Sequence, residues 1–153
     1  MLRQTFTDRL NQSMKAREMR TVSTIRLMLA ELKERDIAAW GRGNAEGLSD
    51  VEIQRMLHAM IKQRRESIPL SERGNRADLA QQEREEIAVI EGLLPAQLDQ
   101  SEIEEAVVAA IGETGAAGIK DMGRVMGVLR ERHDGVIDLA QAGVIAKRLL
   151  GKV

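Results

Sequence analysis

The sequence predicts an all-α protein, and three of its features lead to this fold class. Its core must be built from helix-favouring residues, because the 153 residues include eight Met but only one Phe, one Trp and no Tyr. The β-branched and aromatic runs typical of strands are missing. Apolar residues instead recur three and four positions apart, the spacing of one helix face. We predict two unlike helical domains, a bundle of about four helices over residues 1–94 and a bundle of about three short helices over residues 95–153.

Two amphipathic helices are predicted in the first 40 residues. The second is expected at about residues 19–37, and the glycine-rich stretch 41–47 after it is a loop by composition. The apolar stripes that predict the two helices are Leu2, Phe6, Leu10 and Met14, then Val22, Ile25, Leu29 and Leu32.

A third helix should begin at Ser49, because Ser49 and Glu52 have the spacing of a capping box. We expect it to end near Ser67, since Pro69 disfavours helical geometry in the residue before it. A fourth helix is predicted over residues 76–93, closed by Pro95. The stripes of these two helices are Ile53, Met56, Leu57, Met60 and Ile61, then Leu79, Ile87, Ile90 and Leu94.

Three further helices are predicted after Pro95. A capping box at Ser101 and Glu104 should open the first, glycines at 112, 115 and 118 should end it, and the next should begin at about Asp121. Asp138, with Gln141 three residues later, should cap the last helix. The stripes are Ile103, Val107, Ala110 and Ile111; Met122, Val125, Met126 and Leu129; and Ala142, Ile145, Ala146 and Leu149.

The net charge of −1 conceals three blocks of opposite sign. Residues 1–76 hold 15 Lys and Arg against 10 Asp and Glu, residues 77–118 hold 1 against 10, and residues 119–153 hold 7 against 4. Such blocks suggest a polyanionic partner or pairing between blocks. The absence of Cys excludes disulfides and thiolate chemistry. With no signal-peptide or membrane-spanning segment in view, we expect a cytoplasmic protein without a membrane partner.

The residues offer no catalytic constellation. His58 and His133 lack partners at an informative spacing, and we interpret them as structural or surface histidines. The carboxylates Glu83, Glu85, Glu86 and Glu91 share one helix, whereas acid–base or metal chemistry needs groups that converge from different elements. We therefore predict no catalytic residue, no metal site and no cofactor.

Two basic regions are candidates for binding nucleic acid through phosphate contacts. The first comprises Lys62, Arg64, Arg65, Arg73 and Arg76. Its alternative interpretation is a solvated face that pairs with the acidic helix 77–91.

The second region is a helix face left bare by Gly123 and Gly127, which are four residues apart, with Lys120 and Arg124 beside them. Its alternative interpretation is close packing against another helix. Gly115 and Gly118 are interpreted as connector residues, because the nucleotide-binding GXXG loop belongs to a fold with strands.

Several of these stretches together resemble the YqeY family, which is related to the tail domain of the GatB subunit of the glutamine-dependent tRNA amidotransferase. The resemblance runs in order along nearly the whole chain. It is carried by residues 23–26, 61–68 (Ile-Lys-Gln-Arg-Arg-Glu-Ser-Ile), 76–80 with Glu83 and Glu86, 94–98 (Leu-Pro-Ala-Gln-Leu), 114–115, 119–126 (Ile-Lys-Asp-Met-Gly-Arg-Val-Met), and Gly135 with Asp138.

The resemblance implies two unlike helical domains and a link to tRNA-dependent amidation, since the family is described as carbon–nitrogen ligases with glutamine as amido-N-donor. The role that the resemblance implies for the GatB tail is to hold tRNA, and the chemistry lies elsewhere in that enzyme. We therefore expect an accessory module that binds tRNA or another structured RNA and has no active site of its own. The alternatives are a subunit of an amidotransferase, or a helical adaptor that binds another protein through the acidic helix 77–91 and its Met-bearing faces.

Overall fold

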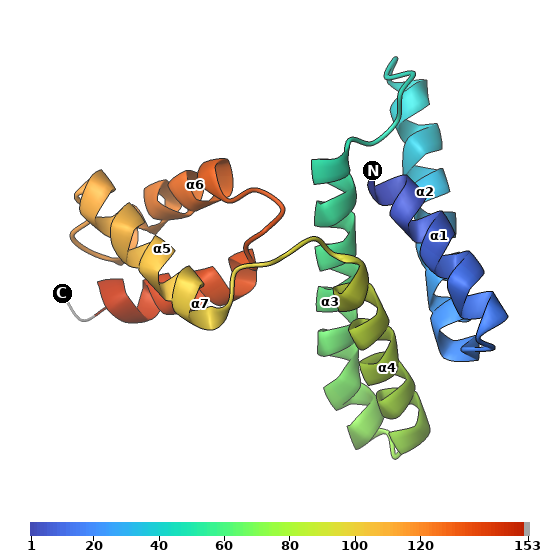
Figure 1. The fold of residues 1–153 in the computed structure, drawn as a ribbon. Helices are drawn as coiled ribbons and strands as arrows, with labels where there is room; N and C mark the ends of the chain where they lie inside the picture. Colours follow the sequence, from blue (N-terminus) through green and yellow to red (C-terminus); the bar gives the residue numbers. More distant parts are fainter. Residues whose placement is uncertain (152–153) are drawn as a thin grey trace. The chain divides into compact units, whose positions relative to one another are not determined.

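The computed structural model describes residues 1–151, and over this range the chain is helical with no strand (Figure 1). The prediction of an all-α fold is confirmed. None of the described helices is long and apolar enough to cross a membrane. The elements are α1 (Leu2–Lys15), α2 (Met19–Gly41), α3 (Asp50–Arg73), α4 (Ala77–Leu93), α5 (Gln100–Thr114), the 3₁₀ turn η1 (Ile119–Asp121), α6 (Met122–Arg132) and α7 (Leu139–Leu150).

Between Leu94 and Pro95 the chain divides into two compact units. In the first unit, α3 and α4 form an antiparallel hairpin, α2 packs against α4, and α1 packs against α2 (Figure 1). Its core contains most of the predicted apolar stripes, including the five residues predicted for α3. Two stripe positions were wrong: Met14 is 48% exposed and Leu79 is 36% exposed, because both lie near helix ends.

Helix α3 begins as predicted but does not end at Ser67. Ser49 and Glu52 form the expected capping box, with the Ser49 side chain accepting from the Glu52 amide. The helix continues through Pro69 to Arg73. Pro69 removes one backbone hydrogen bond from the helix, and contacts with α4 offset this cost, since the Ser71 hydroxyl donates to Glu83 at 2.9 Å. Tertiary packing therefore overrides the local preference against a helix before proline.

A buried carboxylate fastens the loop 42–49 to α1 and α2. Arg3 donates to both carboxylate oxygens of Asp36, at 2.7 and 2.8 Å, and also to the Leu48 carbonyl. The Leu48 amide in turn donates to Asp36. Gly47 has a φ of +76°, and a Cβ there would lie 2.4 Å from Oδ1 of Asp36, so the loop needs glycine at this position. The Arg3 guanidinium holds the pKa of Asp36 below its ordinary value.

The second unit packs α5, α6 and α7 against one another around its own core. Helix α5 begins two residues earlier than predicted, because Asp99 and Glu102 form its capping box in place of Ser101 and Glu104. Gly112 lies inside α5, whereas Gly115 ends it with a left-handed φ of 66°. The predicted cap at Asp138 is confirmed, since its carboxylate accepts from the amides of Ala140 and Gln141.

Candidate nucleic-acid interface

Two adjacent arginines of the α3 basic region, Arg64 and Arg65, form ion pairs with acids of α4. Nε of Arg64 lies 2.7 Å from a carboxylate oxygen of Glu86, and their side chains are only 16% and 9% exposed. Gln82 donates to the other oxygen of Glu86. Arg65 pairs with Glu91 at 3.1 Å, with both side chains about half exposed. These pairs match the alternative interpretation, in which the basic face of α3 is neutralised by the acidic helix.

The remaining basic candidates of the first unit are dispersed. Lys62 and Arg73 are exposed on α3. Arg76 stands at the start of α4, where its guanidinium pairs with Asp78 and lowers the pKa of that carboxyl. In the opposite sense, Arg84 of α4 pairs with Glu72 of α3. Three arginines of this hairpin, Arg64, Arg65 and Arg84, therefore pair with acids of its other helix.

The glycine face of α6 is open. Gly123 and Gly127 are exposed, and a Cβ built on either would meet no atom within 4 Å. The alternative of close packing against another helix of the unit is therefore wrong. Positions 120, 123, 124, 127, 130 and 131 lie on one side of α6 and the turn before it, opposite the buried Val125 and Leu129.

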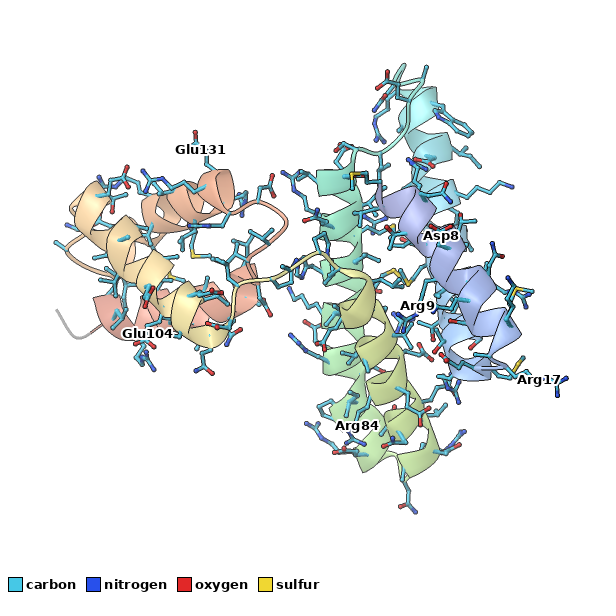
Figure 2. The ribbon with its side chains drawn as sticks, viewed as in Figure 1. Asp8, Arg9, Arg17, Arg84, Glu104 and Glu131 are labelled. Atoms are coloured by element: carbon cyan, nitrogen blue, oxygen red, sulfur yellow. The ribbon has the colours of Figure 1, made fainter. Side chains whose placement is uncertain are left out.

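Three exposed cations and one carboxylate surround the glycines. Lys120 and Arg124 were predicted, whereas Arg130 was not. Arg130 stands seven residues after Gly123, so helical spacing alone would have placed it on the same face. Glu131 follows Arg130 near the C-terminal end of α6, and its side chain points away from the helix into solvent (Figure 2). The face thus combines bare backbone with positive charge and a single acid at its margin.

Arg124 is held in place by the turn that precedes α6. Its guanidinium lies 2.7 Å from Asp121 and also donates to the Thr114 carbonyl. The Ala117 amide donates to the other oxygen of Asp121. This amide and Arg124 both lower the pKa of Asp121, which keeps the carboxylate charged. Asp121 therefore positions Arg124, and the Asp121 side chain itself is only 15% exposed.

The two histidines lie in different units, and the acids of α4 named in the sequence analysis have partners. His58 lies half-buried on α3 and His133 follows the end of α6, so they belong to different units. Of the carboxylates on α4, Glu85, Glu86 and Glu91 pair with arginines and Glu83 accepts from Ser71. No group of three or more potential metal ligands occurs within residues 1–151.

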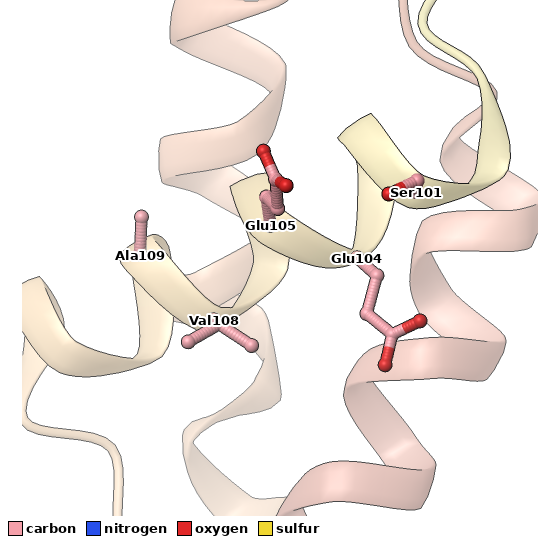
Figure 3. A pocket seen from close by; sticks show the side chains of 5 residues that line it. All are labelled: Ser101, Glu104, Glu105, Val108 and Ala109. Atoms are coloured by element: carbon pink, nitrogen blue, oxygen red, sulfur yellow. The ribbon is translucent and has the colours of Figure 1, made fainter.

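A hollow of about 430 Å³ lies on the outer side of α5 (Figure 3). All its lining residues come from this one helix, so it is an open surface between side chains and encloses no substrate. The lining residues are Ser101, Glu104, Glu105, Val108 and Ala109.

Comparison with known proteins agrees with the sequence resemblance. No curated protein matches the chain. The model of the family described as Yqey-like protein matches residues 3–150, which is essentially the whole chain. Two dissimilar helical units, a hairpin joined by ion pairs between its helices and an exposed basic glycine face are thus features of a protein that belongs to the YqeY family.

Proposed function

We propose that this protein is an accessory module that binds structured RNA, with tRNA as the foremost candidate, through the outer face of α6. The observation that carries the proposal is the exposure of Gly123 and Gly127 with nothing within 4 Å of their missing side chains. A phosphate backbone can approach a helix closely at such positions. Lys120, Arg124 and Arg130 stand around them and supply the charge that phosphate contacts require.

The α6 face is favoured over the basic region of α3 because the cations of the two regions differ in their ion pairs. On α3, Arg64 and Arg65 already neutralise Glu86 and Glu91, so RNA would have to displace these acids. On α6, Arg130 has no ion-pair partner among the described residues, and Arg124 remains 61% exposed beside Asp121. Lys and Arg side chains that reach phosphates release counterions from the nucleic acid, and exposed cations can do this without first leaving a buried acid. The α6 face is therefore the better site.

The identity of the RNA rests on the resemblance to the tail domain of the amidotransferase subunit. That resemblance supports tRNA and a role in tRNA-dependent amidation, with the amide-transfer chemistry carried out by another protein. A stand-alone ligase is disfavoured, because Glu85, Glu86 and Glu91 of α4 already pair with arginines and the hollow on α5 is open to solvent.

The first test removes charge from the α6 face. In the triple variant Lys120→Gln, Arg124→Gln, Arg130→Gln, tRNA affinity should fall, and the slope of log K against log salt should decrease by about 1 for each phosphate that is no longer neutralised. Filter binding over a salt series measures both. The matched control is Arg9→Gln, Lys15→Gln, Arg17→Gln, which removes three exposed charges from the first unit. Equal losses in the two triple variants would contradict a specific role for α6.

The second test adds bulk without changing charge. Gly123→Leu and Gly127→Leu should weaken tRNA binding, because the side chains would keep the phosphate backbone away from the helix. Both positions are exposed and helical, so each substitution should raise the free energy of unfolding by up to about 1 kcal/mol. A gain in stability combined with a loss of RNA binding separates the site from a folding defect. Unchanged tRNA binding in both variants would end the proposal.

A further inference from the structure

Helix α2 carries an exposed row of residues with strict heptad spacing. The members recur at alternating intervals of four and three over the whole helix, and every one of them is exposed. The buried residues Val22, Ile25 and Leu32 lie on other sides of the helix, toward α1 and α4. We call this surface the α2 row; it consists of Met19, Ser23, Arg26, Ala30, Lys33, Ile37 and Trp40.

The α2 row combines large apolar side chains with unpaired positive charge. Met19 is 68% exposed, and Ile37 and Trp40 are each 51% exposed. Arg26 and Lys33 have no ion-pair partner among the described residues. No acid belongs to the row, although Glu34 lies beside it. By contrast, the nearby arginines Arg3, Arg20 and Arg35 all pair with carboxylates of their own unit.

The spacing of the row indicates what kind of partner it fits. Alternation of four and three residues is the seam of a coiled coil, in which a second helix places its side chains between those of the first. Trp, Met and Arg are enriched in protein interfaces, and Trp and Arg often contribute most of the binding energy. A partner helix would need apolar residues against Ile37 and Trp40 and acids near Arg26 and Lys33.

A second copy of this chain fits the row poorly. In a parallel pair of α2 helices, Arg26 would face Arg26 of the other copy. In an antiparallel pair, Arg26 would face Lys33. Like charges placed opposite each other cost several kcal/mol at an interface. RNA is also disfavoured, because nucleic-acid interfaces are more polar and more positive than a row with three large apolar side chains.

We propose that the α2 row binds an amphipathic helix of another protein whose apolar seam is flanked by Asp and Glu. This inference is independent of RNA binding, because it concerns α2 in the first unit and the RNA proposal concerns α6 in the second. The protein would then join an RNA to a protein through two separate surfaces, a role that suits an accessory module without chemistry of its own.

Trp40 makes the proposal directly testable, because it is the single Trp of the chain and belongs to the row. The probe is a synthetic helix of about three heptads with an apolar seam flanked by Glu. The control peptide, called the basic twin, has the same sequence with Lys in place of every Glu. Titrated into the full-length protein, the acidic probe should move Trp40 emission to shorter wavelength as the indole is buried, and the basic twin should not.

The decisive variant reverses the charge of the row. Arg26→Glu with Lys33→Glu should bind the acidic probe at least about tenfold more weakly and should acquire affinity for the basic twin. The matched control, Lys15→Glu with Arg17→Glu, changes the net charge equally at the end of α1 and in the turn after it. It should behave as the unaltered protein. Circular dichroism should confirm that both variants remain helical.

Four outcomes would overturn the proposal. The first two are no emission change with either probe, and equal binding of both probes. The third is that tRNA shifts the Trp40 emission and displaces the acidic probe, which would assign the row to RNA. The fourth is a dimer in sedimentation that the double variant abolishes, which would assign it to a second copy. Loss of tRNA binding in the α6 variants alters none of these readouts.

Discussion

The basic segment of α3 and the basic face of α6 look alike in the sequence and differ in the structure. On α3, Arg64 and Arg65 are paired with acids of α4. On α6, the cations surround exposed glycines and face solvent. Two adjacent arginines of the denser cluster are therefore already paired across the hairpin, whereas Lys62 and Arg73 of the same cluster are exposed. Availability of a cation thus depends on partners distant in the sequence, and charge density alone is a poor guide to a binding surface.

The largest effect should come from breaking the buried pair that neutralises α3. Arg64→Met keeps much of the side-chain volume but leaves Glu86 buried without its cation. We expect the free energy of unfolding to fall by about 3 kcal/mol, measured by urea denaturation, while tRNA affinity stays unchanged. If tRNA affinity fell while the variant remained folded, α3 would have to be counted as a binding surface.

The companion variant separates loss of a charge pair from loss of packing. Arg64→Met combined with Glu86→Leu removes both charges, and it should recover most of the stability that Arg64→Met loses. Failure to recover would mean that the Gln82 contact or the shape of the Glu86 site contributes more than the ion pair does.

A second, intermediate effect concerns the other buried carboxylate. Because Arg3 lowers the pKa of Asp36 below its usual 3.8, the stabilisation that this pair provides is complete above about pH 4 and is lost as the pH falls through the pKa of the folded state. Asp36→Asn should cost about 2 kcal/mol near neutral pH. Urea denaturation at several pH values should show this difference shrinking below about pH 4. A constant difference would contradict the depressed pKa.

The smallest effect tests the exposed member of the α3–α4 pairs. Arg65 and Glu91 are both about half exposed, and exposed pairs contribute roughly 0.2–1 kcal/mol. Glu91→Gln should therefore change stability by less than about 1 kcal/mol. The substitution leaves Arg65 without this acid. If ion pairing is what keeps the basic region of α3 from binding RNA, tRNA affinity should therefore rise slightly. Thermal unfolding and filter binding measure the two effects together.

Sequence reasoning was sufficient for the fold class and for most helix starts, because those depend on local patterns. The capping box at Ser49 and the cap at Asp138 follow from residues within one turn. It was insufficient where distant contacts decide. Helix α3 passes through Pro69 because α4 supports its last turn. At the start of α5 the sequence offers two overlapping capping boxes of equal spacing, and the one formed by Asp99 and Glu102 is the one adopted.

The candidate site was predictable in part for the same reason. Helical spacing was enough to place Gly123, Arg124 and Lys120 on one candidate face, and Arg130 could have been added by the same rule. That the glycines would be open to solvent could not be foreseen, because it depends on where α5 and α7 pack. The α2 row was missed, although its spacing is visible in the sequence, because the buried seam of the same helix was the stronger apolar pattern.

Pro69 affects the local unfolding of the long α3–α4 hairpin. The helix lacks one backbone hydrogen bond at this point, and the residues after it, as far as Arg73, depend on α4 for support. This end of the hairpin should therefore open as a local unit at lower free energy than the central turns around Met56 and Leu57. Amide hydrogen exchange should be fastest there, and limited proteolysis of the native protein should cut first near Gly74.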